Sequence, residues 1–172
     1  SPTRIGFLRV LERMGARVEV VSEGERAGEP VATLRAHGGA ALVATSVAPE
    51  EVPSLIDEVP LLAVVATAAR GETVIRGAGE LRVKESDRLA QVARYLQAMG
   101  ANVEELPDGL IIRGPTPLHP TTVDAARDHR IAMAFAVAGL RAASGPTTIS
   151  GAEWADISFP GFYGLLKMLG AL

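Results

Sequence analysis

A short run of charged residues in the middle of the chain has the composition of an anion-binding site. Lys84, Glu85, Asp87 and Arg88 lie between a predicted strand and a predicted helix. Cations at a helix N-terminus oppose the helix dipole, unless an anion is held there by the side chains and the free backbone N–H groups. Glu85 would then be a carboxyl group able to move a proton beside that anion. The alternative is a solvated charge cluster at a helix start.

The helix after this run is predicted from its apolar spacing. Ser86 is the expected N-cap and Asp87 favours the positive end of the dipole. The apolar side chains recur at helical intervals until a glycine at position 100, and they are Leu89, Val92, Leu96 and Met99. The sequence therefore predicts that the charged run sits at the beginning of an amphipathic helix.

Two further charged groups open predicted helices. Arg130 begins an apolar helix over residues 131–143, where its charge requires either an anionic ligand or a salt bridge to Asp128 or another acid. Its neighbour His129 fits a structural role better than a catalytic one. Asp57 opens another apolar helix, and an acid at that position also serves as a cap. Glu58 is the nearest competitor for any role given to Asp57.

Composition narrows the class of protein. The chain has 172 residues, enough for one domain with a sizeable core, and 48% of them are hydrophobic. A net charge of −3 argues against a general nucleic-acid or membrane-surface binder. There is no cysteine, so disulfides, thiolate metal sites and cysteine nucleophiles are excluded. No signal peptide or membrane-spanning run is apparent, and we expect a cytoplasmic protein.

The order of apolar patterns predicts an α/β (α+β) domain over residues 1–172. Helices are expected at residues 6–14, 57–70, 86–99, 131–143 and 159–169. Strands are expected at residues 16–21, 30–36, 41–47, 72–76, 102–106, 110–113 and 147–150, with turns or loops at 22–29 and 114–122. Two of the helices are apolar on nearly every side and should be buried.

The chain also repeats itself. A helix ends in Met14-Gly15-Ala16, another in Met99-Gly100-Ala101 and the last in Leu169-Gly170-Ala171. The segment that begins at Asp57 runs parallel to the segment that begins at Asp128. Such a pattern indicates repeated units around a local axis, with buried helices inside and sheets outside.

The charged run carries a family resemblance. Lys84-Glu85-Ser86-Asp87-Arg88 resembles a signature of the 5-enolpyruvylshikimate-3-phosphate synthase family, and Asp128-His129-Arg130-Ile131-Ala132-Met133 resembles another. Matches extend from Pro2-Thr3-Arg4 to Ser158-Phe159-Pro160, essentially the whole chain. The resemblance implies an inside-out domain of βαβαββ units with buried parallel helices. It further implies the C-terminal domain of a two-domain enzyme whose other domain is absent here.

The resemblance also implies roles for individual residues. Lys84 and Arg88 would contact phosphoenolpyruvate, and Arg130 would hold its carboxylate. Glu85 would protonate the methylene carbon and later remove a proton from it. Asp57 would engage the hydroxyl group that attacks. Some members carry a lysine where this chain has Ile157, so a difference in glyphosate sensitivity is a possible consequence.

The implied reaction transfers the enolpyruvyl group of phosphoenolpyruvate to the 5-hydroxyl of shikimate 3-phosphate, in the shikimate pathway of aromatic amino acid biosynthesis. It uses no metal or organic cofactor, and glyphosate inhibits it. By itself this chain should bind phosphoenolpyruvate weakly at best and not turn over. Three alternatives remain: an enolpyruvyl transferase with a UDP-N-acetylglucosamine acceptor, a non-catalytic interaction module of the same fold, and an RNA terminal-phosphate cyclase. The acidic balance and missing nucleotide motif count against the cyclase.

Overall fold

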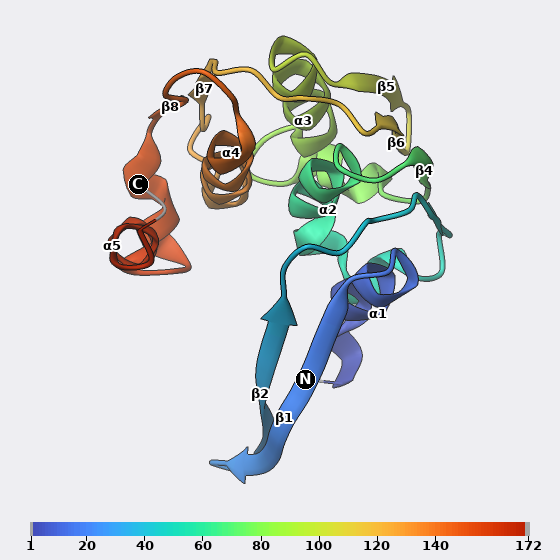
Figure 1. Cartoon of the computed structure of the whole chain (residues 1–172), viewed down its shortest axis with the longest axis vertical. Coiled ribbons are helices and arrows are strands. Elements are labelled where there is room, and N and C mark those ends of the chain that lie inside the picture. Colours follow the sequence, from blue (N-terminus) through green and yellow to red (C-terminus); the bar gives the residue numbers. More distant parts are fainter. Residues whose placement is uncertain (1, 171–172) are drawn as a thin grey trace.

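The centre of the molecule is one βαβαββ unit. The computed structural model describes residues 2–170, and Figure 1 shows their arrangement. The unit consists of β3 (Ser46–Val47), α2 (Val59–Ala66), β4 (Gly71–Ile75), α3 (Arg88–Ala98), β5 (Asn102–Leu106) and β6 (Gly109–Gly114). Its strands form one sheet in the order β3-β4-β6-β5, in which β3 is parallel to β4 and the other neighbours are antiparallel.

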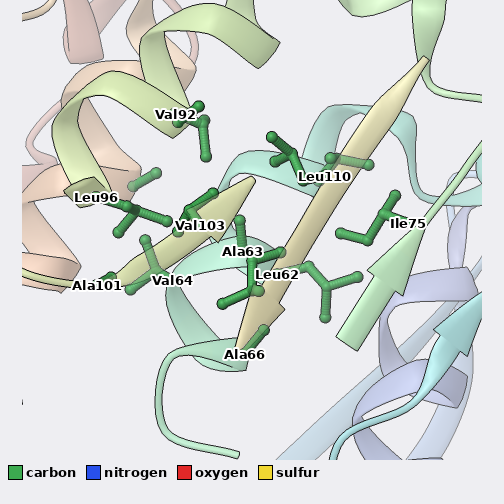
Figure 2. Packing of buried hydrophobic residues seen from close by; sticks show 14 of the residues in the cluster. Leu62, Ala63, Val64, Ala66, Ile75, Val92, Leu96, Ala101, Val103 and Leu110 are labelled. Carbon is green, nitrogen blue, oxygen red and sulfur yellow. The ribbon is translucent and has the colours of Figure 1, made fainter. Parts of the chain in front are cut away.

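This unit is held together by apolar side chains between the sheet and its helices. Leu62 and Val64 of α2, Leu96 of α3 and Leu110 of β6 are all fully buried or nearly so. Figure 2 shows these side chains converging in the space between the two helices and strands β5 and β6. Three short 3-10 helices lie in the connections, η2 (Val52–Ser54), η3 (Ile56–Glu58) and η4 (Gly79–Val83). The predicted burial of the helix containing Leu62 is confirmed.

A long hairpin precedes the central unit. It follows η1 (Pro2–Arg4) and α1 (Gly6–Arg13), and its strands are β1 (Arg17–Arg26) and β2 (Glu29–His37). The expected turn at residues 22–29 is wrong, because both strands continue to a two-residue turn at Ala27 and Gly28. These residues have φ values of 52° and 80°, and positive φ at both positions matches the twist of antiparallel strands. The hairpin projects from the body in Figure 1.

The last part of the described chain begins a further unit. It contains β7 (Thr122–Asp124), α4 (His129–Arg141), β8 (Thr148–Ser150), η5 (Ala152–Ile157) and α5 (Phe162–Met168). Strand β7 pairs parallel with β8. It was not expected from the sequence, because the strand is only three residues long and comes directly after a proline-rich loop. Helix α5 starts later than expected because η5 and a turn occupy the preceding residues. Helix α4 packs against α2, and its buried residues confirm the burial that its apolar sequence predicted.

Glycine ends the helices in the manner that the repeated pattern predicted. Gly15, Gly100 and Gly170 follow α1, α3 and α5 with φ values of 92°, 90° and 70°. This left-handed conformation favours glycine and closes the helix C-terminus before the chain turns. The expected mixture of helices and strands is confirmed, although only Ser46–Val47 of the predicted strand 41–47 forms a strand. Within residues 2–170, no helix is long and apolar enough to cross a membrane.

Candidate functional site

The charged residues singled out from the sequence meet at the N-terminal ends of three helices. Asp57 lies on η3 directly before α2, Arg88 is the first residue of α3, and His129 and Arg130 are the first two of α4. The three helices contact one another, α2 with α4 most extensively, and Figure 1 shows them grouped in the body of the molecule. Three positive dipole ends therefore converge where the charged side chains gather, which favours a bound anion.

Arg88 is the centre of this group. Its side chain is 2% exposed and forms ion pairs with three carboxylates, Asp57, Glu85 and Asp128. Nε donates to Asp128 Oδ2 at 2.8 Å, and Nη2 donates to Glu85 Oε2 at 2.6 Å and to Asp128 Oδ1 at 3.2 Å. We call Arg88 with these three acids the Arg88 network. A buried guanidinium needs such partners, since an unpaired charge in the interior is costly.

The Arg88 network changes what the sequence implied for this arginine. Arg88 was expected to contact an anionic ligand, yet two of its three nitrogens donate to carboxylates. Nη1 approaches Asp57 Oδ1 at 3.5 Å and is the least engaged of the three. An incoming anion can therefore reach Arg88 only through Nη1 or by replacing a carboxylate.

Asp128 is the most buried acid of the network. Its side chain is 0% exposed, and as the N-cap of α4 it accepts from the backbone N–H of Arg130 at 2.9 Å. Burial raises the pKa of Asp128. The hydrogen bond and charge of Arg88 and the hydrogen bond from Ser86 lower it by more than burial raises it, so the net pKa lies below its ordinary value. Ser86 was expected to cap α3, and that expectation is wrong. Its hydroxyl donates to Asp128 Oδ2 at 2.9 Å, while Asp87 caps α3 by accepting from Ala90 N.

Asp57 has a more open position in the same network. Its side chain is 25% exposed, and Arg4 donates a hydrogen bond to its Oδ2. Arg130 Nη2 lies 3.8 Å from the same oxygen. Burial alone raises the pKa of Asp57, but the hydrogen bond from Arg4 and the charges of three arginines lower it, and the net pKa is below its ordinary value. Asp57 is therefore an ionised, partly accessible hydrogen-bond acceptor at neutral pH.

Arg130 has one hydrogen-bonded acid and one more distant one, Asp57. Its Nη1 donates to Glu58 Oε1 at 3.1 Å, so the salt bridge goes to Glu58 and not to the Asp128 side chain. Its Nε is buried without a hydrogen-bond partner among residues 2–170. The Nε–Nη2 edge of the guanidinium makes no hydrogen bond within residues 2–170, although Nη2 faces Asp57 Oδ2 at 3.8 Å. This edge suits a carboxylate that accepts two parallel N–H groups, provided that the atoms covering Nε move aside.

A cavity of about 220 Å³ adjoins Arg130, Asp57 and Glu58. Its remaining walls are apolar and come from the first turn of α2, from α4 and from the segment around the start of α5. They are Pro60, Leu61, Met133, Ala134, Val137, Phe159 and Phe162. The charged groups at one end therefore meet an apolar space, a common form for a small-molecule site.

Glu85 and His129 lie near each other without a hydrogen bond, whereas Lys84 is not part of the Arg88 network. Glu85 is 45% exposed, and its Oε1 lies 3.9 Å from His129 Nδ1, too far for a hydrogen bond. Lys84 forms an ion pair with Glu80. In the described part of the chain, Lys84 makes no ion pair with the acids around Arg88. The structure thus brings together Asp57, Glu85, Arg88 and the pair at 129–130, but leaves Lys84 paired elsewhere.

The balance of charge differs from the crowd of cations that the sequence suggested. The three arginines of the region are each paired with an acid. They are Arg4, Arg88 and Arg130, and the acids are Asp57, Glu58, Glu85 and Asp128. Lys84, outside this group, is paired with Glu80. Any multiply charged anion that binds here must displace some of these acids or bring additional cations to the site.

Sequence reasoning missed the partners that make the group work. Arg4 and Ser86 were given no site role, Glu58 was considered only as a competitor of Asp57, and Asp128 only as a salt-bridge partner of Arg130, although each contacts a candidate residue. Only Asp128 had a usable signal, since an acid directly before an apolar helix that starts with two basic residues is a favourable N-cap. The contacts of Arg4 and Glu58 span 53 and 72 residues and have no local pattern.

Comparisons with known proteins agree on one family. A family model described as EPSP synthase (3-phosphoshikimate 1-carboxyvinyltransferase) matches residues 1–166. The chain is 53% identical over 169 residues to a 3-phosphoshikimate 1-carboxyvinyltransferase of Synechococcus sp. (strain JA-3-3Ab), covering 98% of this chain and 38% of that protein. A protein of the same description from Desulforamulus reducens is 52% identical over 97% of this chain and 38% of its own length. The chain thus spans about two fifths of the length of these curated relatives.

Solved structures give the same result for the fold. An EPSP synthase structure from Acinetobacter baumannii superposes with a TM-score of 0.92 at 41% identity, covering 98% of this chain and 39% of that one. The enolpyruvyl transferase NikO from Streptomyces tendae superposes with a TM-score of 0.71 at 26% identity, covering 97% and 35%. The expected α/β fold of the enolpyruvyl transferase type is confirmed.

Proposed function

The chain belongs to the EPSP synthase (3-phosphoshikimate 1-carboxyvinyltransferase) family, and on that premise we propose that it supplies the phosphoenolpyruvate side of an active site. In the complete enzyme, the enolpyruvyl group of phosphoenolpyruvate would pass to the 5-hydroxyl of shikimate 3-phosphate. The chain would be the C-terminal domain of a two-domain protein. The observation that carries the proposal is the meeting of Asp57, Glu85, Arg88 and Arg130 at three helix N-termini.

Arg130 is the proposed holder of the phosphoenolpyruvate carboxylate. Glu58 fixes its Nη1, and the opposite Nε–Nη2 edge has no hydrogen-bond partner among residues 2–170. A carboxylate that binds this edge gains two charge-assisted hydrogen bonds. The adjoining 220 Å³ cavity has apolar walls beside this edge. Lys84 and Arg88 are the proposed second group of anion contacts. The ligand would replace Glu80 as the partner of Lys84, or Glu85 as a partner of Arg88.

Glu85 and Asp57 are the proposed groups that move protons. The addition step requires Glu85 in its protonated form, after the ligand has replaced it as a partner of Arg88. The carboxyl proton of Glu85 then goes to the methylene carbon, the 5-hydroxyl oxygen attacks the neighbouring carbon, and Asp57 accepts the hydroxyl proton. In the elimination step, Glu85 takes a proton back from the new methyl group, the carbon–oxygen bond to phosphate breaks, and the leaving phosphate takes the proton that Asp57 holds. Glu85 is exposed enough to meet a ligand, and His129 lies near its other oxygen at 3.9 Å. Asp57 suits an acceptor because its arginine neighbours keep it ionised.

This chain would provide only part of the positive charge that the substrates require. Its cations are all matched by acids in the site, whereas the two substrates together carry two phosphates and two carboxylates. Relatives are longer than this chain, and we propose that their additional segment forms the other domain and contributes the missing cations and the shikimate 3-phosphate contacts. The isolated chain should accordingly bind phosphoenolpyruvate weakly and not turn over.

The setting of the reaction is part of the proposal. We place the complete enzyme in the cytoplasm, in the shikimate pathway, with glyphosate competing for the phosphoenolpyruvate side. Ile157, where some family members carry a lysine, is 65% exposed and offers no positive charge to such a ligand. Glyphosate is therefore expected to bind more weakly than it would with a lysine there, and an Ile157→Lys variant compares the two cases.

The test is a hybrid enzyme in which residues 1–172 replace the matching segment of the Synechococcus relative. Phosphate release should occur with phosphoenolpyruvate and shikimate 3-phosphate. It should fall by about 100-fold or more in Arg130→Ala and Glu85→Gln, because each removes a group that contacts the reacting molecule. The control is Arg113→Ala, an exposed arginine paired with Glu72 and Glu104 on the central sheet.

Two results would contradict the proposal. Release with UDP-N-acetylglucosamine instead of shikimate 3-phosphate would indicate the other acceptor class. A folded hybrid without release on either acceptor, together with calorimetry in which this chain and the hybrid fail to bind phosphoenolpyruvate, would favour a non-catalytic module. Weak calorimetric binding by the chain alone that is lost in Arg130→Ala, but not in Arg113→Ala, would place the anion site on this half.

A further inference from the structure

Arg4 is the one arginine that hydrogen-bonds Asp57 in the described structure. It lies on η1 and donates from Nη2 to Asp57 Oδ2, across 53 residues of sequence. Arg88 and Arg130 also face Asp57, but their nitrogens lie 3.5 and 3.8 Å from its oxygens. The proposed function gives Arg4 no role, and the sequence pattern did not indicate one.

We propose that Arg4 is a positioning residue that fixes the Asp57 carboxylate for the attacking hydroxyl of the acceptor. The inference rests on the proposed function, in which Asp57 accepts the proton of that hydroxyl. Arg4 occupies Oδ2, so the carboxylate cannot rotate without breaking a charge-assisted hydrogen bond. Oδ1, which faces Arg88 Nη1 at 3.5 Å, is the oxygen left for the hydroxyl.

The other two arginines cannot replace Arg4 in this task. Arg88 is shared with Glu85 and Asp128, and Arg130 is held by Glu58. Both are also the proposed contacts of phosphoenolpyruvate, so their charges are redirected toward the ligand when it binds. Arg4 lies outside that set of contacts. It therefore keeps its interaction with Asp57 in both the free and the ligand-bound states.

The electrostatics of Asp57 agree with this geometry. Arg4 from η1, Arg88 from α3 and Arg130 from α4 face it with positive charge, and Glu58 is its neighbour on η3. Glu85 and Asp128 do not contact Asp57 directly but are paired with Arg88, which faces it. Burial raises the pKa of Asp57, and the Arg4 hydrogen bond is the largest influence that lowers it. Loss of Arg4 should therefore raise this pKa. In the variant, Asp57 would then become protonated at a higher pH than in the wild type, and protonated Asp57 cannot accept a proton.

The experiment compares Arg4→Gln and Arg4→Lys with Arg9→Gln in the hybrid enzyme. Arg9 is an exposed arginine on α1 and serves as the matched control. In Arg4→Gln, kcat should fall about 10-fold at neutral pH, the KM for phosphoenolpyruvate should change less than about twofold, and the acidic limb of the kcat profile should move to higher pH. Arg4→Lys should restore the acidic limb but only part of kcat, because lysine keeps the charge without the planar fork.

A second measurement separates this inference from the proposed function. Carbon-detected NMR titration of Asp57 in this chain should show a higher pKa in Arg4→Gln and an unchanged one in Arg9→Gln. In an Asp57→Asn background, Arg4→Gln should cost no further activity, since the two residues act as one unit. An inactive hybrid whose Asp57 titration still shifts would count against the proposed function alone. An Arg4→Gln variant with an unaltered Asp57 titration would overturn the role of Arg4.

Discussion

The starts of α2 and α4 present two carboxylates to the same guanidinium in different surroundings. Asp57 and Asp128 occupy corresponding places in two repeated units, and both form ion pairs with Arg88. Asp128 is fully buried, caps α4 and accepts hydrogen bonds from Arg88, Ser86 and two backbone N–H groups. Asp57 is 25% exposed and accepts one from Arg4. The repeat therefore supplies two acids that differ in burial. Asp128 is enclosed as a structural partner of Arg88, whereas Asp57 is open enough for the proton-accepting role that we propose for it.

The largest expected effect is on Asp128. Asp128→Ala removes the N-cap of α4 and leaves Arg88 buried with less countercharge. Breaking a buried ion pair from one side costs about 3–5 kcal/mol, so the free energy of unfolding should fall by about that amount. Urea denaturation of the chain measures it, with the exposed Glu50→Ala as the control. A loss no larger than that of the control would show that Asp128 is not the structural member of the pair.

The pH dependence of stability should reveal both acids. The pKa values of Asp57 and Asp128 are lowered in the folded chain, so their contribution is present above the unfolded pKa of about 3.9 and is lost as the pH falls through the folded values. Asp128→Asn should flatten this acid dependence by up to one proton, on the order of 1.4 kcal/mol per pH unit. Denaturation series at several acidic pH values test the slope. An unaltered slope would contradict the assignment.

A smaller effect is expected at Ser86, which supports only one of the two acids. Its hydroxyl donates to Asp128 Oδ2 at 2.9 Å. Ser86→Ala should destabilise the chain by about 1 kcal/mol, the usual net value of one hydrogen bond. Thermal unfolding measures this, with Ser22→Ala in the exposed hairpin as the control. Equal melting temperatures for the two variants would show that the Ser86 hydrogen bond to Asp128 does not stabilise the chain.

The smallest effect on stability should come from Asp57. Asp57→Asn breaks contacts with half-exposed Arg4 and with Arg130, and such pairs contribute about 0–1 kcal/mol. The unfolding free energy should therefore change by less than about 1 kcal/mol, while the hybrid enzyme loses most of its activity. Parallel denaturation and phosphate-release assays test the separation. A destabilisation as large as that of Asp128→Ala would contradict the proposed difference between Asp57 and Asp128.

Local patterns predicted the parts of the fold that depend on neighbours in sequence. The apolar runs around Leu62 and Phe135 predicted buried helices, because a helix without a polar face must be covered. The glycines at positions 15 and 100 predicted helix ends. The hairpin turn failed because polar residues at 22–26 resemble a loop, whereas pairing with β2 decides their conformation. Ser86 failed as a cap because a carboxylate far along the chain binds its hydroxyl.

The candidate site divides in the same way. By itself the sequence determined which residues we propose for the chemistry, since the charged pentad at 84–88 and the group at 128–130 combine residue types and spacing that resemble family signatures. It also determined that they stand at helix starts, because capping and apolar periodicity are local.

Only the tertiary structure decided what each charge is bound to. Arg88 is buried among three carboxylates, two of them 31 and 40 residues distant in sequence, and Arg130 is held by Glu58 rather than by its near neighbour Asp128. Such pairings depend on how the helices pack, and no local pattern encodes a contact between distant turns. The physical reason is that capping acts within one turn of a helix, whereas charge pairing and burial depend on the packing of the whole fold.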